Sequence, residues 1–311
     1  MSLRLASISI DLDEVPLYAA MHGLATPRGP SAHAVYDHCV PRLAEWLEDE
    51  SIRATFFVIG KDLERDENRE TISGLQLAGH EIANHSYHHR YDLTRRAPVE
   101  IREDVERGAD AIEGACGKRP IGFRAPGYTV NDTLLSALEA SGVEYDSSVF
   151  PCPSYYAAKV AALAAIRLRG RKSASILDTP AVLRAPRDPY RVGRPYWRRG
   201  DGLLEIPIGV TPLQLPYIGT SLVLGGESIA ERLTKQMLGK ELINLELHGF
   251  DAADATEDGL GTLAPHRADL RRTAADKLRS LRAAIGTIRD AGYELVTLEE
   301  AARRFRSQPT Q

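Results

Sequence analysis

The stretch LASISIDLD, residues 5–13, decides how the rest of the chain is interpreted. It is an apolar run, typical of a buried strand, and it ends in the carboxylates of Asp11 and Asp13. Successive side chains of a strand point to opposite faces, so two residues separated by one position point the same way. We therefore expect a strand over Leu5–Asp11 whose carboxyl end presents two acids to one side.

Further apolar runs alternate with amphipathic stretches along the chain. The other expected strands are Ala54–Ile59, His80–Asn84, Gly122–Arg124, Leu242–His248 and Tyr293–Thr297. The expected helices are Val40–Glu50, Pro98–Ala115, Asp132–Ser141 and Pro265–Ala291. This alternation predicts an α/β fold built on a parallel sheet or barrel. Neither an internal repeat nor a linker-like tract divides the chain, so we expect one domain over residues 1–311.

The composition is that of an ordinary globular protein and argues against several classes. Of 311 residues, 43% are hydrophobic and 26% are charged, and the net charge of −4 argues against binding to nucleic acid. The spacing of Cys39, Cys116 and Cys152 indicates neither a disulfide framework nor a cysteine zinc site. The sequence shows no signal-peptide pattern and no apolar run of transmembrane length. We therefore expect a cytoplasmic protein.

The motif HSYHH, residues 85–89, supplies the partners for the acidic pair. His85 and His89 are four residues apart, so one helical or turn-like step places them on one face. One aspartate and two histidines form an open three-ligand site for Zn²⁺, and Fe²⁺, Co²⁺ and Ni²⁺ accept the same donors. The second aspartate is then placed to take a proton from water. This pattern indicates a metal-assisted hydrolase.

Two more polar residues end expected strands. Arg124 closes Gly122–Arg124, and His248 closes Leu242–His248. Active sites of β/α barrels gather at the carboxyl ends of the strands, so both side chains are candidates for the same site.

At this point the sequence resembles a known family, the NodB-homology polysaccharide deacetylases of carbohydrate esterase family 4. The similar motifs are ATFFVIG (54–60), AGHEIANHSYHH (78–89), RAPGY (124–128) and Leu247-His248. They cover roughly residues 5–150 and 240–300. The resemblance implies an α/β fold of the distorted (β/α) barrel type, with an insertion at about 151–225.

The resemblance also implies a role for each candidate. The metal ligands would be Asp13, His85 and His89. Asp11 would be the general base and His248 the general acid that protonates the departing amine. Arg124 would hold Asp11 ionised and oriented.

The motifs depart from the family pattern in two places. In the first motif, Leu12 separates the two aspartates, which are adjacent in the commonest form. In the fourth motif, Tyr145-Asp146-Ser147-Ser148 matches the start, but Val149-Phe150 stands where an Asp-Trp pair is expected. The acid that tunes His248 therefore stays open between Asp251 and Asp146.

Substrate contacts can be proposed near these motifs. The candidates are Tyr128, Pro126, Asp146 and Trp197. A backbone N–H near Tyr128 is a candidate for stabilising the tetrahedral oxyanion, and Trp197 is either a packing residue or a platform for a sugar ring.

The insertion is basic in an otherwise acidic chain. Residues 166–200 hold ten Arg or Lys side chains against two acids. This pattern indicates either a solvated loop or a basic surface that meets phosphate groups or the periphery of a membrane. The apolar stretches Tyr155–Leu168 and Thr211–Leu224 would suit a lipid-linked substrate, and the second would equally suit an interface in a homo-oligomer.

The function that these observations favour is metal-dependent removal of an N-acyl group, N-acetyl in the first instance, from a sugar or sugar-like substrate. One alternative is hydrolysis of another non-peptide C–N amide, such as a formamide on a lipid-linked amino sugar. The other is a saccharide-binding module without catalysis on the same fold.

Overall fold

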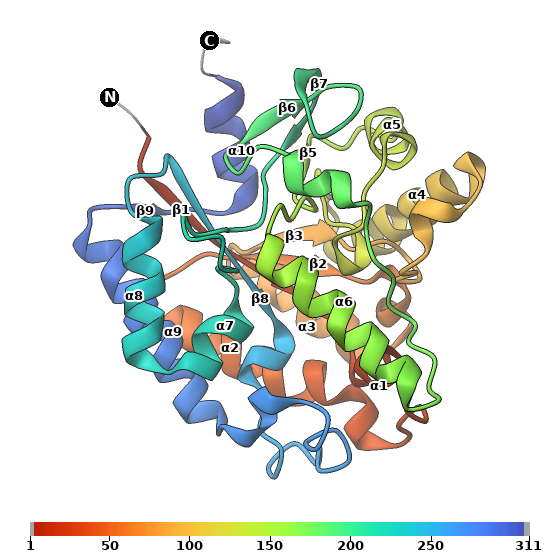
Figure 1. Cartoon of the computed structure of the whole chain (residues 1–311), viewed down its shortest axis with the longest axis vertical. Helices are drawn as coiled ribbons and strands as arrows, with labels where there is room; N and C mark the ends of the chain where they lie inside the picture. The colour runs from red at the N-terminus through yellow and green to blue at the C-terminus, as the bar shows by residue number, and fades with distance from the viewer. Residues whose placement is uncertain (1–2, 308–311) are drawn as a thin grey trace.

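The computed structural model describes residues 3–307, which form a curled sheet wrapped by helices (Figure 1). The first strand, β1 (Leu5–Asp11), is buried at all seven residues. It pairs in parallel with β2 (Thr55–Val58) on one side and with β8 (Leu242–His248) on the other. The remaining strands are β3 (Glu81–Asn84), β4 (Gly122–Phe123), β5 (Tyr145–Asp146), β6 (Tyr190–Val192), β7 (Arg199–Glu205) and β9 (Glu294–Leu295).

The sheet curls into a distorted barrel. Its order is β6-β7-β5-β4-β3-β2-β1-β8, with β9 paired to the start of β1, and among the described pairs β6 with β7 alone is antiparallel. Residues 206–218 lie between β5 and β8. Ile206 N–H donates to the carbonyl of Asp146 at 2.8 Å, and Ile218 forms a parallel bridge with Glu246. The predicted distorted α/β barrel is therefore confirmed.

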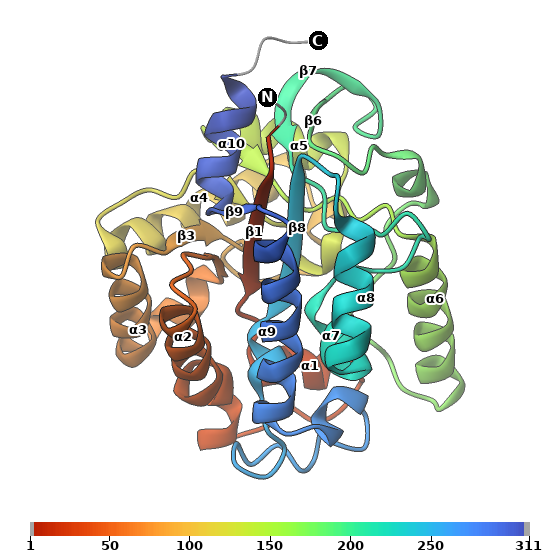
Figure 2. The same cartoon turned by 90° about the vertical axis from the view of Figure 1, so that its left-hand side faces the viewer.

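Helices cover the outside of this sheet. They are α1 (Val15–Met21), α2 (Val40–Asp49), α3 (Asp66–Leu77), α4 (Pro98–Cys116), α5 (Asp132–Ala140), α6 (Pro153–Leu168), α7 (Gly219–Gly225), α8 (Glu227–Met237), α9 (Ala274–Asp290) and α10 (Leu298–Arg306). In α2, Val40, Leu43 and Leu47 are buried at helical spacing. Figure 2 shows α2, α9 and α8 side by side over β1 and β8, which places the main core between this layer and the sheet.

Two predicted boundaries are wrong for local reasons. The helix expected to begin at Pro265 begins at Ala274, because the hydroxyl of Thr273 caps it by accepting from the N–H of Asp276 at 3.1 Å. The strand expected over Tyr293–Thr297 is reduced to β9, because Thr297 caps α10 instead. The expected helices do not include α1, α3, α7, α8 or α10.

The insertion at 151–225 is joined to the rest of the fold. It contributes β6 and β7, which extend the sheet beyond β5. The description of the whole chain as one domain stays a prediction. Within residues 3–307, no helix has the length and apolar character needed to cross a membrane.

Candidate metal-dependent active site

Three potential metal ligands converge beyond the carboxyl ends of β1 and β3. Asp13 follows β1, and His85 and His89 lie in the turn after β3. Ser86 and His89 have positive φ values, and this tight turn brings the two imidazole rings to 4.8 Å between centroids. Oδ1 of Asp13 lies 3.3 Å from Nε2 of His85 and 3.2 Å from Nε2 of His89. The structure thus brings together the predicted ligand set.

The chemistry of these side chains fits a divalent metal ion. Oδ1 of Asp13 and both ring nitrogens of His89 are buried without a hydrogen-bond partner among the described residues. Nδ1 of His85 lies 2.7 Å from the carbonyl oxygen of Arg124, an arrangement that leaves Nε2 free to coordinate. Unpartnered buried polar atoms are costly, and a cation bound by all three residues would satisfy Oδ1 of Asp13 and one ring nitrogen of His89. One carboxylate and two imidazoles suit Zn²⁺ with a coordination position left open.

The charges within this group act against the effect of burial. Burial alone would raise the pKa of Asp13, but the imidazoles of His89 and His85 hold that pKa well below its usual range. Burial favours the neutral form of His85, but the carboxylates of Asp11 and Asp13 outweigh it and raise the His85 pKa. A dense buried group of this kind is typical of functional sites.

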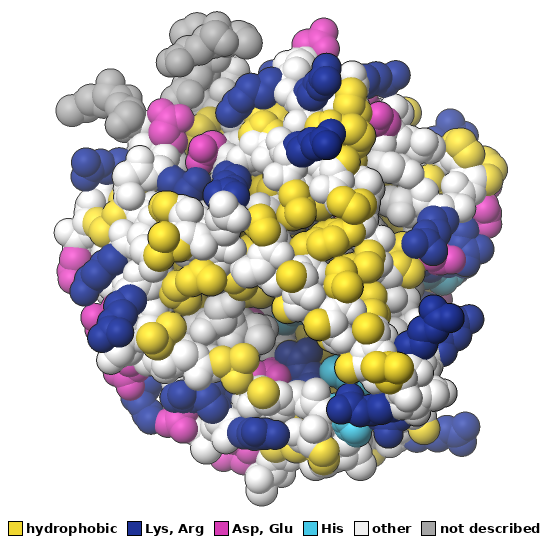
Figure 3. Space-filling model, viewed as in Figure 1, with side chains coloured by type: hydrophobic (Ala, Val, Ile, Leu, Met, Phe, Trp, Pro, Cys, Tyr) yellow, Lys and Arg dark blue, Asp and Glu magenta, His cyan; other side chains and the backbone are white. Residues whose placement is uncertain are grey.

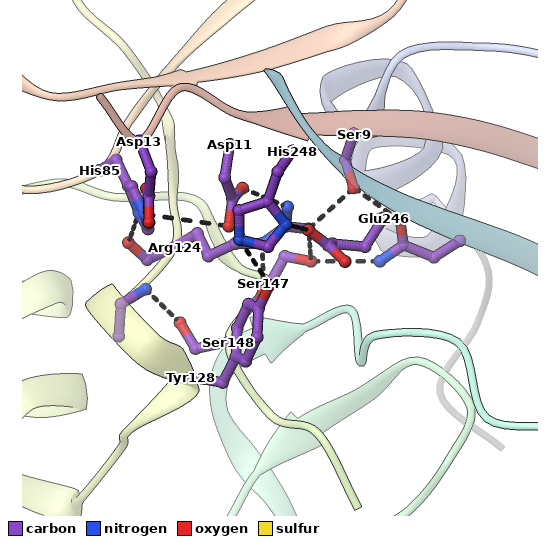
Figure 4. Close-up of polar contacts among 12 residues, drawn as sticks. Ser9, Asp11, Asp13, His85, Arg124, Tyr128, Ser147, Ser148, Glu246 and His248 are labelled. Carbon is purple, nitrogen blue, oxygen red and sulfur yellow. Dashed lines mark hydrogen bonds and ion pairs between the residues drawn. The ribbon is translucent and has the colours of Figure 1, made fainter. Parts of the chain in front are cut away.

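Asp11 faces the ligand group from the end of β1 and is paired with Arg124. Nη1 of Arg124 donates to Oδ1 of Asp11 at 2.6 Å, while Oδ2 of Asp11 lies 3.8 Å from Nε2 of His85. The guanidinium is completely buried, and its other donors reach the carbonyl of Ser147 at 2.8 Å and the hydroxyl of Ser9 at 2.8 Å (Figure 4). Because hydrogen bonds on several sides hold the planar guanidinium of Arg124 in place, it fixes the orientation of Asp11.

His248 lies beside Asp11, and its acidic partner is Glu246. Asp11 and His248 are in register between β1 and β8. Nδ1 of His248 lies 2.9 Å from the completely buried carboxylate of Glu246, and Nε2 lies 3.3 Å from the hydroxyl of Tyr128 (Figure 4). Burial alone would lower the pKa of His248, but Glu246 outweighs it and raises that pKa to about 10. The structure therefore supplies a protonated imidazole next to the metal-ligand group.

Sequence reasoning missed Glu246. The two acids considered for this role have other partners: Asp251 accepts from the backbone N–H of His248 at 2.9 Å, and Asp146 accepts from the hydroxyl of Ser148 at 2.6 Å. A signal was present in the sequence, because residues two apart on a strand share a face and Glu246 precedes His248 by two.

The site opens into a cleft of about 620 Å³. Asp11, Asp13, His85 and His248 line it, and so does the predicted contact Tyr128. The N–H of Tyr128 itself donates to the carbonyl of Ala125 at 3.0 Å, and an oxyanion donor near Tyr128 stays a prediction.

The structure does not bring the other three predicted substrate contacts to this cleft. Pro126 and Asp146 are buried beneath it and do not line it. Trp197 packs against Tyr196, with ring centroids 5.2 Å apart, and against the apolar cluster that includes α5. Its interpretation as a packing residue fits this position, and the sugar-platform interpretation does not.

The basic side chains of the insertion are divided among different parts of the surface. Arg169 and Arg171 line a cavity next to the cleft together with His22 and His266. Arg194 lines a separate hollow beside α5. The single basic surface considered for membrane contact therefore does not form from these three residues.

Comparison with known sequences finds matches to part of the chain. The family model "Polysaccharide deacetylase" matches residues 28–145. A chitooligosaccharide deacetylase from Bradyrhizobium sp. (strain ANU 289) is 32% identical over 145 residues, which are 44% of this chain and 65% of that protein. A peptidoglycan-N-acetylglucosamine deacetylase from Bacillus cereus is 29% identical over 104 residues, which are 33% of this chain and 47% of that protein. These matches thus span less than two thirds of either relative.

Comparison with solved structures supports the fold over nearly the whole chain. A polysaccharide deacetylase homologue from Mycobacterium smegmatis covers 99% of this chain and 94% of its own, with a TM-score of 0.61 and 19% identity. A pseudoenzyme of carbohydrate esterase family 4 from Bacillus anthracis covers 96% of this chain and 66% of its own, with a TM-score of 0.51 and 13% identity. At such identities the likeness concerns the fold alone, and activity has to be argued from the site.

Proposed function

We propose that this chain, which belongs to the polysaccharide deacetylase family, is a metal-dependent hydrolase of an N-acyl amide on a sugar or sugar-like substrate. The observation that carries the proposal is that Asp11 and His248 lie beside the group Asp13, His85 and His89, and that Asp11, Asp13, His85 and His248 line one cleft. Amide hydrolysis needs a base for water and an acid for the leaving nitrogen on the same substrate, and this arrangement offers both.

The names of the relatives support an N-acetyl group as the part removed. They refer to deacetylation of chitooligosaccharide and of N-acetylglucosamine in peptidoglycan. We therefore place N-acetylated amino sugars first among the substrates of this chain.

We infer that Asp13, His85 and His89 would hold one divalent ion, with Zn²⁺ as the first candidate. Fe²⁺, Co²⁺ and Ni²⁺ accept the same donors. When bound, the ion would polarise the scissile carbonyl and lower the pKa of water toward about 7.

The acid and the base would act in sequence. Asp11 takes a proton from the attacking water, whose oxygen forms a bond to the carbonyl carbon. His248 then gives its proton to the nitrogen as the C–N bond breaks, which yields the free amine and a carboxylic acid that loses its proton to solvent. Arg124 keeps Asp11 aimed at the water, and Glu246 keeps His248 protonated and aimed by its Nδ1. Transfer of a proton from Asp11 back to His248 restores the starting state.

Release of acetate and of formate from matched N-acetyl and N-formyl amino sugars tests this function. Purified protein would be assayed as isolated, after a chelator, and after Zn²⁺ is added back. Acetate release that the chelator abolishes and Zn²⁺ restores is the expected result. Release of formate without acetate would support the alternative function, hydrolysis of a formamide. If neither product forms with any metal and the saccharide still binds, the enzyme hypothesis is rejected. The protein is then a saccharide-binding module.

A further inference from the structure

Helix α6 crosses the catalytic cleft, and it packs against the apolar clusters of the fold through Tyr155 and Tyr156 in its first half. None of its sixteen residues is buried, and it contains no acid. At its first half, Nζ of Lys159 donates to the carbonyl of Gly127 at 3.0 Å. Beyond its end, the hydroxyl of Ser173 donates to the carbonyl of Met21 at 2.6 Å. Figure 1 shows α6 as a diagonal bar across the front of the molecule that ends near α1.

The second half of α6 makes an apolar part of the cleft wall, whereas Ser154 and Lys159 of its first half also line the cleft. Its Ala162, Leu163 and Ile166 line the same cleft as the metal-ligand group. The segment that contains α7 adds Leu215, Ile218 and Leu224. We call these six side chains the apolar wall.

Apolar side chains continue from this wall onto the outer surface. Eight large apolar residues are exposed within residues 3–307, and five of them belong to α6 or to residues 213–224. They include Leu168, which is 88% exposed, and Leu213, which is 70% exposed. Figure 3 shows apolar side chains gathered on the part of the surface where Figure 1 draws α6. Exposed apolar surface of this kind marks a binding site more often than an ordinary solvated face.

A long polysaccharide would be a poor occupant of this wall. Each sugar unit carries hydroxyl groups that would lose water against Leu163 or Ile166 without gaining a hydrogen bond. A hydrocarbon chain has no such cost and gains from leaving water.

We propose that the apolar wall holds a hydrocarbon chain of the substrate, so that the natural substrate is an amphiphilic N-acyl amino sugar. This proposal rests on the proposed function and names its substrate class. The α6 part of the wall, from Ala162 to Ile166, spans about 6 Å of the helix at 1.5 Å per residue, and Leu215, Ile218 and Leu224 extend the wall beyond the helix. The hydrocarbon chain is either the aglycone of the sugar or a long N-acyl group. Both would make the same apolar contacts with the wall.

Two substrate series test the proposal and separate the two sources. One series varies the aglycone of N-acetylglucosaminides (methyl, butyl, octyl), and the other varies the N-acyl group of glucosamine (acetyl, butanoyl, octanoyl). All are used below their critical micelle concentrations. Values of kcat/KM are measured with the zinc-loaded protein, and affinity is measured by calorimetry with Asp11→Asn, which removes the proposed base.

Transfer of one methylene out of water predicts an increase of about two- to fourfold in affinity per added carbon in the series that reaches the wall. The double variant Leu163→Ser/Leu224→Ser should reduce the octyl-to-methyl ratio at least tenfold. Both positions are incompletely buried, so the fold should persist, and thermal unfolding checks this. The matched control is Leu77→Ser on α3, which is 81% exposed and lies outside the cleft lining; it should leave the ratio unchanged.

The possible results separate this proposal from the function it rests on. If all compounds of both series are hydrolysed with equal kcat/KM and bound with equal affinity, the apolar wall does not bind a hydrocarbon chain. The proposed deacetylase activity would stand. If affinity rises with chain length but no compound is hydrolysed, the apolar wall binds a hydrocarbon chain and the proposed hydrolase function is wrong. A length dependence that survives the double variant would also overturn the wall.

Discussion

Glu246 and His248 point to the same face of β8, and the Glu246 carboxylate lies 2.9 Å from Nδ1 of His248. The carboxylate is completely buried, and His248 presents its other nitrogen toward Tyr128 in the cleft. The acid that holds the histidine therefore comes from the histidine's own strand and not from the fourth motif, where Val149 and Phe150 replace the expected pair.

Replacing Glu246 with Gln should shift the alkaline limb of activity to lower pH. The pKa of His248 is about 10 against an ordinary value of 6.5, because Glu246 outweighs burial. A general acid works while protonated, so its contribution is complete at neutral pH and is lost as the pH rises through the folded-state pKa. Without Glu246, Asp13 and Asp11 still raise the pKa of His248, but its largest opponent of burial is gone, so that pKa falls. A pH profile of kcat measures the shift.

Glu205→Gln is the matched control for this variant. Glu205 is also a completely buried carboxylate, but it lies next to Asp146 and accepts from the N–H of Val149 at 2.9 Å. Its loss changes packing and charge without removing the partner of His248. If both variants moved the alkaline limb equally, Glu246 would have no specific role.

Replacing His89 with Ala should remove the metal, whereas His88→Ala should not. His89 faces Asp13, but Nδ1 of His88 lies 2.5 Å from Asp104 on α4. Elemental analysis after dialysis measures the difference. Retention of a full complement of metal by His89→Ala would show that the ligand set is wrong.

Asp11→Asn should leave the metal in place and abolish turnover. The substitution keeps the shape of the side chain and removes the base, and loss of a general base costs about 10²–10⁴-fold in rate. Metal content, substrate affinity and kcat are measured on the same preparation. Unchanged kcat would assign the proton transfer to another group.

Arg124→Met should destabilise the fold as well as inactivate the enzyme. It leaves the buried carboxylate of Asp11 without its ion-pair partner, a change that typically costs about 3–5 kcal/mol in the free energy of unfolding. Urea unfolding measures this value. Arg96→Met is the control, because its ion pair with Asp92 is exposed and such pairs contribute about 0–1 kcal/mol.

The parts of the fold that could be predicted are those with a local signal. The apolar run before Asp11 and the HSYHH motif predicted β1 and the turn that brings His85 to His89, because strand alternation and four-residue spacing act over short distances. The helix expected from Asp132 begins at that residue as α5, where the side chain of Asn131 accepts from the N–H of Leu134 at 2.8 Å.

The parts that could not be predicted depend on distant segments. The fork of Arg124 reaches Ser9 and Asp11 across the sheet, and no spacing rule links positions more than a hundred residues apart. The path of α6 over the cleft depends on how the insertion returns to α1, which its alanine-rich sequence does not specify. The cytoplasmic location, the membrane contact and the oligomeric state stay predictions.

Metal stoichiometry measured together with acetate release tests the central claim most directly. Wild type and His85→Ala would be compared after reconstitution with Zn²⁺ and dialysis, with an N-acetylated amino sugar as substrate. We predict about one metal ion per wild-type chain with acetate released, and neither in the variant. Acetate release by wild type that is independent of bound metal, or metal bound equally by both proteins, would contradict the account.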